Sequence, residues 1–383
     1  FRMQSLKIRR SVQFYVLLFT IAVTTAMGSS VVSAQQSKSP NQIPATQQQY
    51  RLIKQGEGPF NLTVVDAPVK QPGEHEVLVK VHAVSLNRRD VMIAKGFYPV
   101  GPKTSLVPLS DGAGEVVGVG SKVSRFKSGD RVAAIFFQKW LAGRPDADVG
   151  ASAMGGSIDG MLSQYVTLHE DGLVSIPAHL SYEEAATLPC AAVTAWNALV
   201  SRGRMQANDN VLLLGTGGVS IFGLQFAAAA GAKPIITSSS DAKLARAKSL
   251  GAVATVNYRT TPEWDKAVRE ATGGVGAHQA LEVGGQGTLA KSIASMGGGG
   301  HVAIIGGLAG FGGDIPAVSL MGRSVSVTGI FVGSRADFEA MNTFISEHKL
   351  QPVVDKVFDF KDAQAAYDYM DSGSHFGKLV IRL

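Results

Sequence analysis

A glycine-rich turn between an apolar strand and a helix is the first stretch of this sequence with chemical potential. In "VLLLGTGGVSIFG" (211–223), Gly215, Gly217 and Ser220 stand in a G-x-G-x-x-S arrangement. Glycines permit a tight turn, and a helix N-terminus offers unpaired N–H groups to an anion. Serine replaces the usual third glycine, so an ordinary strand-to-helix turn is the alternative. The setting within a strand–helix series favours a dinucleotide pyrophosphate site.

The tip of the second strand of that series bears on which nicotinamide cofactor would bind. NAD enzymes usually carry an acidic residue there, which accepts from the ribose 2′-OH. This sequence has hydroxyl residues at 237–240, and Asp241 follows at a helix start, where capping explains it. Lys243 and Arg259 lie nearby in sequence, either as ligands of a 2′-phosphate or as solvated surface charges. We therefore predict NADP(H) rather than NAD.

The elements that must position these residues follow two patterns. From Tyr50 to about Ile176, short strands and turns predict a β-rich, barrel-like unit (50–177). From 178 to 333, apolar strands alternate with helices, the α/β pattern of a doubly wound parallel sheet. Residues 334–383 predict two helices and a strand that return to the first unit. The expected strands are 76–86, 111–120, 129–137, 162–168, 211–215, 234–239, 254–258, 279–285, 301–307 and 377–383, with 324–331 as an edge strand.

The first 34 residues have the layout of a secretory signal: basic residues, an apolar run over 12–27, and small residues ending at Ala34. The run is short of the roughly 20 residues that span a bilayer, which disfavours the alternative of a membrane anchor. We expect cleavage after Ala34, no stable membrane insertion, and a periplasmic or secreted protein. A different start site would leave it in the cytoplasm. Residues 35–49, rich in Gln and Pro, predict a disordered linker.

The positive charge of the chain lies mostly in that signal. The whole sequence has a net charge of +6, and residues 1–34 hold four basic and no acidic residues. The remaining 32 basic and 30 acidic residues give +2, so the charge offers no support for nucleic-acid binding.

In order and spacing, several stretches resemble the medium-chain dehydrogenase/reductase superfamily, and more closely its zinc-independent quinone oxidoreductase branch. Among them are "SLNRRDVMIAKGFYP", "EEAATLPCAAVTAWNAL" and "FGKLVIRL". The resemblance implies a GroES-like β-barrel domain, a Rossmann domain, and NADP(H) with a small-molecule substrate in the cleft between them. It assigns the pyrophosphate to Gly215, Gly217, Gly218 and Val219, the 2′-phosphate region to Ser239, Lys243 and Tyr258, the cleft side of the cofactor to Thr194, Phe331 and Lys378, and the active site to Asn87 and Tyr98.

The resemblance also bears on metal binding. Zinc-dependent relatives place their ligands where this chain has Asn87, Ser110-Asp111 and Cys190, and a catalytic zinc needs three protein ligands. The eight histidines show no ligand-like spacing. We predict a metal-free site, in which Cys190, the single cysteine, is inert packing rather than a nucleophile.

Without a Lewis acid, we expect hydride transfer to an electron-poor acceptor, a quinone or an α,β-unsaturated carbonyl. Asn87 and Tyr98 are the candidate hydrogen-bond donors, unless they only hold turns, and Tyr98 is the candidate proton donor. The alternatives are a zinc-free NADP-dependent alcohol or aldehyde dehydrogenase and a non-catalytic NADPH-binding redox sensor. The glycine-rich stretch 296–313 predicts a loop over the cofactor, and the strand 324–331 predicts pairing with its copy in a homodimer.

Overall fold

The first sheet carries the N-terminal half of the candidate site. The computed structural model describes residues 43–54, 56, 58–312, 314–315 and 317–383. Within them, this sheet runs β15-β16-β3-β5-β6-β8, with β7 also paired to β3. All of its pairings are antiparallel except β15 with β16. The strands are β3 (Glu76–Leu86), β5 (Asp111–Val119), β6 (Arg131–Ala134), β7 (Tyr165–His169), β8 (Leu173–Ser175), β15 (Val354–Asp359) and β16 (Lys378–Arg382).

A smaller sheet, β2-β1-β4, lies beside the first, with β1 (Thr46–Lys54), β2 (Phe60–Pro68) and β4 (Ser105–Leu106). Strand β1 corrects the predicted linker 35–49, because residues 46–49 are already extended and paired with β2. The polar composition misled the prediction. Gln47 is buried with its side-chain oxygen accepting from the Tyr165 N–H at 2.6 Å and the Ser163 hydroxyl at 2.9 Å. The predicted signal (1–34) and residues 35–42 lie outside the described residues.

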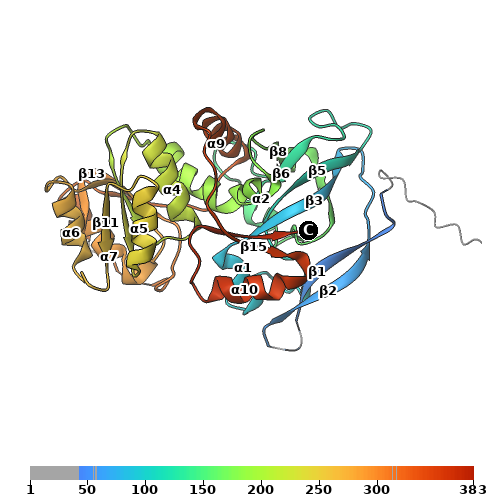
Figure 1. Ribbon diagram of the computed structural model, residues 1–383, viewed down its shortest axis with the longest axis horizontal. Coiled ribbons are helices and arrows are strands. Elements are labelled where there is room, and N and C mark those ends of the chain that lie inside the picture. The colour runs from blue at the N-terminus through green and yellow to red at the C-terminus, as the bar shows by residue number, and fades with distance from the viewer. Residues whose placement is uncertain (1–42, 55, 57, 313, 316) are drawn as a thin grey trace, which may run out of the picture. The chain divides into compact units, whose positions relative to one another are not determined.

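The second lobe is a six-stranded parallel sheet in the order β11-β10-β9-β12-β13-β14, on the left of Figure 1. Strand β14 stands at the edge of the sheet, as predicted. Strand β13 begins at Met296, five residues before the expected strand 301–307, so residues 296–300 of the stretch predicted as a loop over the cofactor (296–313) also belong to a strand. The strands are β9 (Asn210–Leu214), β10 (Lys233–Ser238), β11 (Ala254–Asn257), β12 (Ala277–Glu282), β13 (Met296–Ile304) and β14 (Ser326–Gly329).

Helices cover and connect the sheets, and two π-helical segments flank α3. Within the described residues, no helix is both long and apolar enough to cross a membrane. The α-helices are α1 (Arg88–Ala94), α2 (Tyr182–Ala185), α3 (Val193–Trp196), α4 (Gly218–Ala229), α5 (Asp241–Ser249), α6 (Trp264–Ala271), α7 (Leu289–Ala294), α8 (Ala317–Met321), α9 (Arg335–His348) and α10 (Ala363–Asp371). The π segments are Leu188–Ala192 and Asn197–Arg202; short 3-10 turns are Val149–Ser152, Glu170–Gly172, Gly285–Gly287 and Phe360–Asp362.

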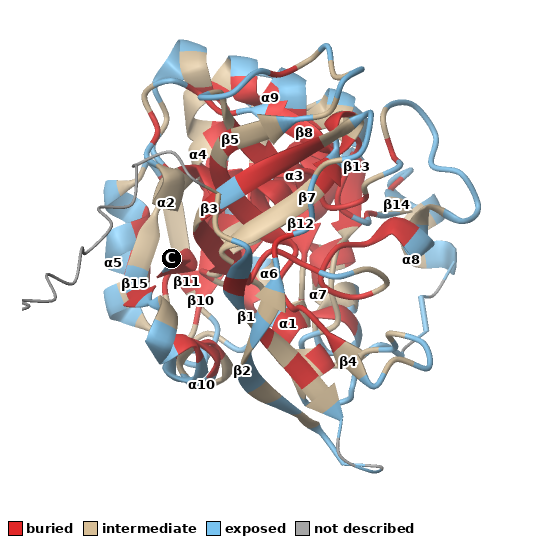
Figure 2. Ribbon diagram, turned by 90° about the vertical axis from the view of Figure 1, so that its right-hand side faces the viewer, coloured by how far each residue is buried: buried red, intermediate tan, exposed pale blue. Residues whose placement is uncertain are grey.

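The C-terminal segment returns to the first sheet, where β16 lies between β15 and β3. Figure 1 shows the red helix α10 beside the cyan helix α1, which are in contact. One continuous core joins the lobes, since Phe136 and Val174 of the first lobe pack in the same cluster as Phe222 and Ile236 of the second. Figure 2 shows the buried residues concentrated in the central strands and α3. The two halves of the site are therefore held against each other by apolar packing.

Candidate active site

A buried lysine lies at the centre of the candidate site. Lys378, the first residue of β16, is 2% exposed. Its ammonium group donates to the backbone oxygen of Leu86 at 2.7 Å and to Oδ1 of Asn87 at 2.7 Å, and it lies 3.5 Å from Oδ2 of Asp111. These three partners come from the end of β3, the turn after it, and the start of β5. The cluster joins segments more than 260 residues apart in sequence.

Local structure explains the position of Asn87. It is the N-cap of α1, and its backbone N–H donates to Oδ2 of Asp90 at 2.7 Å. The strand β3 ends at Leu86, so Asn87 stands where an apolar strand turns into a helix. Its side-chain nitrogen Nδ2 is buried and makes no full hydrogen bond within the described structure, although the Asn87 side chain lies close enough to Asp111 to lower the pKa of that carboxyl group. A buried donor without a partner costs free energy, so this nitrogen is suited to receive an oxygen atom of a ligand.

Asp111 is completely buried beside this lysine, and its Oδ1 accepts from the hydroxyl of Ser110 at 2.7 Å. Burial raises the pKa of Asp111, although the Lys378 ammonium, the Asn87 side-chain amide and the Ser110 hydroxyl oppose that rise. Sequence reasoning noticed Ser110-Asp111 only as a position without zinc ligands. The signal that could have identified it is an acidic residue at the start of an otherwise apolar, glycine-rich strand.

Cys190 lies in the π-helical segment before α3 and is partly exposed. Burial of its sulfur, and then the negative charge of Asp111, raise the pKa of the thiol well above its ordinary value. A protonated thiol is a poor nucleophile, which agrees with the predicted packing role. Its backbone oxygen accepts from the hydroxyl of Thr194 at 2.6 Å, so Thr194 keeps only its oxygen lone pairs free for a cofactor.

The glycine loop has room for a pyrophosphate. Gly215 has a positive φ of 74°, and Gly217 is the N-cap of α4. A Cβ atom at either residue would meet no atom within 4 Å, so the protein leaves open the space above these two glycines. Ser220, in place of a third glycine, is buried and donates to the Leu214 oxygen at 2.6 Å. Val219, half-buried, follows Gly218 in the first turn of α4. An open glycine turn at a helix N-terminus is suited to an anion such as a phosphate.

The edge formed by the ends of β10 and β11 gathers the residues predicted around a 2′-phosphate. Ser239 is half-buried there, and Tyr258 is 42% exposed. Asp241 accepts from the side-chain amide of Asn257 at 2.7 Å. Lys243 donates to the Gly373 oxygen at 2.9 Å, and burial lowers the pKa of its ammonium group.

Aromatic rings and an arginine lie together near two of the predicted site residues, Phe331 and Tyr98. Phe331 is 51% exposed, and its ring centroid lies 4.8 Å from that of Phe137. The guanidinium carbon of Arg89 lies 4.7 Å from the centre of the Phe136 ring and 5.2 Å from that of Tyr98. The structure thus joins Tyr98 to Arg89, and not to the cluster of Asn87, which sequence reasoning had paired with it. Arg89 was missed; the polar run "NRRD" directly after an apolar strand was the available signal.

Comparisons with known proteins identify the family. Residues 73–178 match the alcohol dehydrogenase GroES-like domain, and residues 218–347 match the zinc-binding dehydrogenase domain. A zinc-type alcohol dehydrogenase-like protein of Schizosaccharomyces pombe is 47% identical over 82% of this chain and 91% of its own length. The chain belongs to the medium-chain dehydrogenase/reductase superfamily.

Solved structures of this superfamily share the fold. A structure described as an alcohol dehydrogenase from Sinorhizobium meliloti is 39% identical, with a TM-score of 0.85 over 89% of this chain and 100% of that one. A structure described as an NAD-dependent alcohol dehydrogenase is 34% identical, with a TM-score of 0.79 over 88% and 99%. The predicted α/β fold, a GroES-like β-barrel plus a Rossmann sheet, is confirmed. The protein is an oxidoreductase of a superfamily that uses nicotinamide cofactors.

The matching domain is named for zinc binding, but the side chains of this chain at the corresponding ligand positions do not fit a zinc ion. No group of three or more His, Cys, Asp or Glu side chains that could hold a metal occurs among the residues that the structure describes. At the positions where zinc relatives hold the ion, an ammonium group instead lies against Asn87 and Asp111. A cation placed beside it would be repelled.

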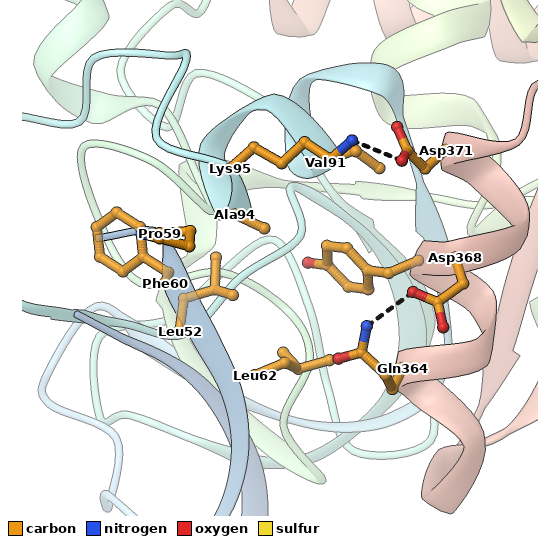
Figure 3. Close-up of a pocket in the computed structure, with 11 residues that line it drawn as sticks. Leu52, Pro59, Phe60, Leu62, Val91, Ala94, Lys95, Gln364, Asp368 and Asp371 are labelled. Carbon is orange, nitrogen blue, oxygen red and sulfur yellow. Dashed lines mark hydrogen bonds and ion pairs between the residues drawn. The ribbon is translucent and has the colours of Figure 1, made fainter. Parts of the chain in front are cut away.

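A separate cavity lies between the β1–β2 hairpin, α1 and α10, with a volume of about 170 Å³ (Figure 3). Leu52, Leu62 and Ala94 contribute apolar surface. The ion pair of Lys95 and Asp371, 2.5 Å apart, closes one side. None of the sequence-predicted site residues lines this cavity.

Proposed function

We propose that this protein is a zinc-independent, NADPH-dependent reductase that transfers hydride to a quinone or an α,β-unsaturated carbonyl. The observation that carries the proposal is the buried, unpartnered Nδ2 of Asn87 next to a fixed ammonium group in place of a metal-ligand set. An amide donor can stabilise the negative charge that develops on a quinol or enolate oxygen. It offers much less help to the oxidation of a simple alcohol, which relies on a Lewis acid.

In this mechanism, bound NADPH supplies a hydride. The Asn87 side chain donates from Nδ2 to the substrate oxygen and holds it in place. Tyr98 remains our candidate for delivering the proton that completes the reduction, and the Arg89 guanidinium lies over its ring. The exposed ring of Phe331, packed against the buried ring of Phe137, provides an apolar surface for a flat acceptor.

The preference for NADPH over NADH rests on the end of β10. The only acidic side chain close to it in sequence, Asp241, is hydrogen-bonded to the amide of Asn257. We assign the 2′-phosphate to Ser239 and to Lys243, whose ammonium group donates to the Gly373 oxygen in this structure. An NAD-dependent enzyme would be expected to direct a carboxylate at the ribose.

Two other functions remain as candidates. One is an NADP-dependent alcohol or aldehyde dehydrogenase without zinc, and its support is that relatives are named as alcohol dehydrogenases. A non-catalytic redox sensor that binds NADPH is the other, and its support comes from the predicted export signal, because NADPH is scarce outside the cytoplasm.

One set of assays separates these functions. The protein is mixed with NADPH or NADH and a naphthoquinone, a small enone or an aldehyde, with and without a strong chelator, and with NADP⁺ and a primary alcohol. We expect NADPH oxidation with the first two acceptors at a rate that the chelator leaves unchanged. Alcohol turnover matching the quinone rate would favour the dehydrogenase. NADPH binding without turnover of any substrate would favour the sensor, and inactivation by the chelator would refute zinc independence.

We further propose export of the protein after cleavage at Ala34, and a homodimer formed through β14. The chain would be sought in the periplasm or medium, and its first residues determined by mass spectrometry; a start at Gln35 is expected. A protein retained inside the cell with residues 1–34 intact would refute export.

A further inference from the structure

The three hydrogen-bond partners of the Lys378 ammonium group all belong to the first lobe. A lysine ammonium has three donors and no acceptor. Here the acceptors around it are the Leu86 oxygen, Asn87 Oδ1 and Asp111 Oδ2. Its aliphatic stem lies against the cofactor loop, since a Cβ atom at Gly218 would come within 2.6 Å of Lys378 Cδ. The family resemblance assigned Lys378 to the cofactor, but its ammonium group donates to the side chain of Asn87.

This arrangement fixes which end of the Asn87 amide faces which way. The oxygen and nitrogen of an asparagine side chain are similar in shape, so their partners decide the orientation. A donor-only partner at 2.7 Å requires the oxygen on its side. The nitrogen is thereby turned away, buried and without a partner.

We propose that Lys378 is a positioning residue: it locks the Asn87 side chain so that Nδ2 is presented to the substrate oxygen. The inference rests on the proposed function, because it assigns Asn87 the role of oxyanion donor. The lysine also polarises the amide, since a donor that bonds to the amide oxygen strengthens the N–H groups as donors. Asp111, whose Oδ1 accepts a hydrogen bond from the Ser110 hydroxyl, keeps the Lys378 ammonium group in place and balances its charge.

A double-mutant cycle tests whether the lysine acts through Asn87. Removal of one oxyanion donor lowers kcat about 100- to 1000-fold, and we expect this of Asn87→Ala with little change in KM or NADPH affinity. Lys378→Met should lower kcat to a similar extent, and the double variant should be no worse than either single one. Multiplied losses, or a loss confined to NADPH affinity, would overturn the proposal. Lys122→Met is the matched control, because Lys122 pairs with Glu74 on the surface.

A second variant protects the test against misfolding. Lys378→Met alone leaves Asp111 as an unpaired buried carboxylate, which is strongly destabilising. The combination of Lys378→Met with Asp111→Asn removes both charges, and it should show the same loss of kcat with a melting temperature near that of the wild type. Wild-type kcat in this folded variant would overturn the proposal.

A spectroscopic measurement separates this inference from the proposed function. The side-chain amide signals of Asn87 in a 15N spectrum are assigned by their loss in Asn87→Ala. They should shift in the Lys378→Met/Asp111→Asn variant and stay unchanged in Lys122→Met. Unmoved signals would overturn the inference whatever the enzyme reduces. Shifted signals in a protein that reduces neither quinone nor enone would refute only the proposed function, and the cycle would then be run with the substrate found.

Discussion

The backbone N–H of Gly377 donates to the carbonyl oxygen of Thr216 at 3.0 Å, which ties the start of the C-terminal strand to the glycine loop. Gly217 and Gly377 also form a parallel bridge. The residue after Gly377 is Lys378, whose ammonium group reaches Asn87. One short segment therefore links the loop that would hold the pyrophosphate to the group that would face the substrate.

Two neighbouring glycines in this loop should respond differently to alanine. At Gly218, a Cβ atom would lie 2.6 Å from Lys378 Cδ and 3.2 Å from the Ala191 Cβ, so Gly218→Ala should lower the free energy of unfolding by about 1–3 kcal/mol. At Gly217, the same atom meets no protein atom within 4 Å. Gly217→Ala should keep the melting temperature and weaken NADPH binding about tenfold, as titration calorimetry would measure. Unchanged affinity would place the pyrophosphate elsewhere.

The cofactor preference should reverse when a carboxylate is placed at the end of β10. Ser239→Asp would repel a 2′-phosphate and offer the ribose of NADH an acceptor. We expect the ratio of kcat/KM for NADPH to that for NADH to fall about 10- to 100-fold, an effect of 1.4–2.8 kcal/mol. Ser249→Asp, on the exposed far end of α5, is the control. A ratio that Ser239→Asp leaves unchanged would argue against NADPH contact at this edge.

Cys190 should be dispensable for turnover. Its thiol stays protonated because burial and the Asp111 charge raise its pKa. Cys190→Ala should therefore retain kcat within about threefold, because no nucleophile is lost. Steady-state kinetics at saturating NADPH would check this, and an inactive variant that still binds NADPH would establish a covalent role instead.

Stability should depend on pH through Asp90. Burial raises the pKa of its carboxyl group from 3.8 to about 7 in the folded protein. Between these two pH values, the folded state holds a proton that the unfolded state has lost. The contribution of Asp90 to the free energy of unfolding is therefore fully present below pH 3.8 and is lost as the pH rises through 7. The loss is on the order of 4 kcal/mol by pH 8.

Asp90→Asn stays neutral and can still accept from the Asn87 N–H, so it should flatten this part of the pH profile. Chemical denaturation between pH 4 and pH 8 would measure the difference from wild type. Asp368→Asn, at an exposed position of α10, serves as the comparison. Parallel profiles for wild type and Asp90→Asn would show that this carboxyl group is ionised throughout.

Light scattering should find a particle of twice the chain mass if β14 pairs with its copy. Val318 and Met321 in the preceding helix are 75% and 76% exposed, which adds apolar surface near this edge. Thr328→Lys would place two like charges at the pairing and should yield monomers, whereas Thr343→Lys on the exposed face of α9 should not. A wild-type monomer would end the dimer hypothesis.

The parallel sheet was predictable because its strands are short apolar runs between helices, and their order along the chain is a local signal. Strand β1 was missed because "TQQQ" carries no alternation of apolar and polar residues, and its pairing comes from contacts with distant segments. The beginning of β13 was missed because four glycines separate Met296, which pairs with Ala277 of β12, from His301, where the regular pairing resumes, and glycines carry no apolar pattern that marks a strand.

The sequence could predict candidate site residues, but it could not predict which of them contact each other. Asn87 and Lys378 are 291 residues apart, and only the placement of β16 beside β3 brings them together. Nothing in the local sequence of "FGKLVIRL" says whether the lysine points at a phosphate or at an amide. Tyr98 was paired with Asn87 because the family resemblance assigns both to the active site, but the turn after α1 directs its ring at Arg89.

The return of β15 and β16 to the first sheet also sets a sequence of events during synthesis. Strand β3 emerges from the ribosome early, but its neighbour β16 is translated only after the whole Rossmann lobe. Until Lys378 has been translated, the edge of β3 beside Leu86 has no neighbouring strand, and the carboxyl group of Asp111 has no ammonium partner. Catalytic competence and completion of the sheet are therefore reached in the same final step, and prematurely terminated chains would carry neither.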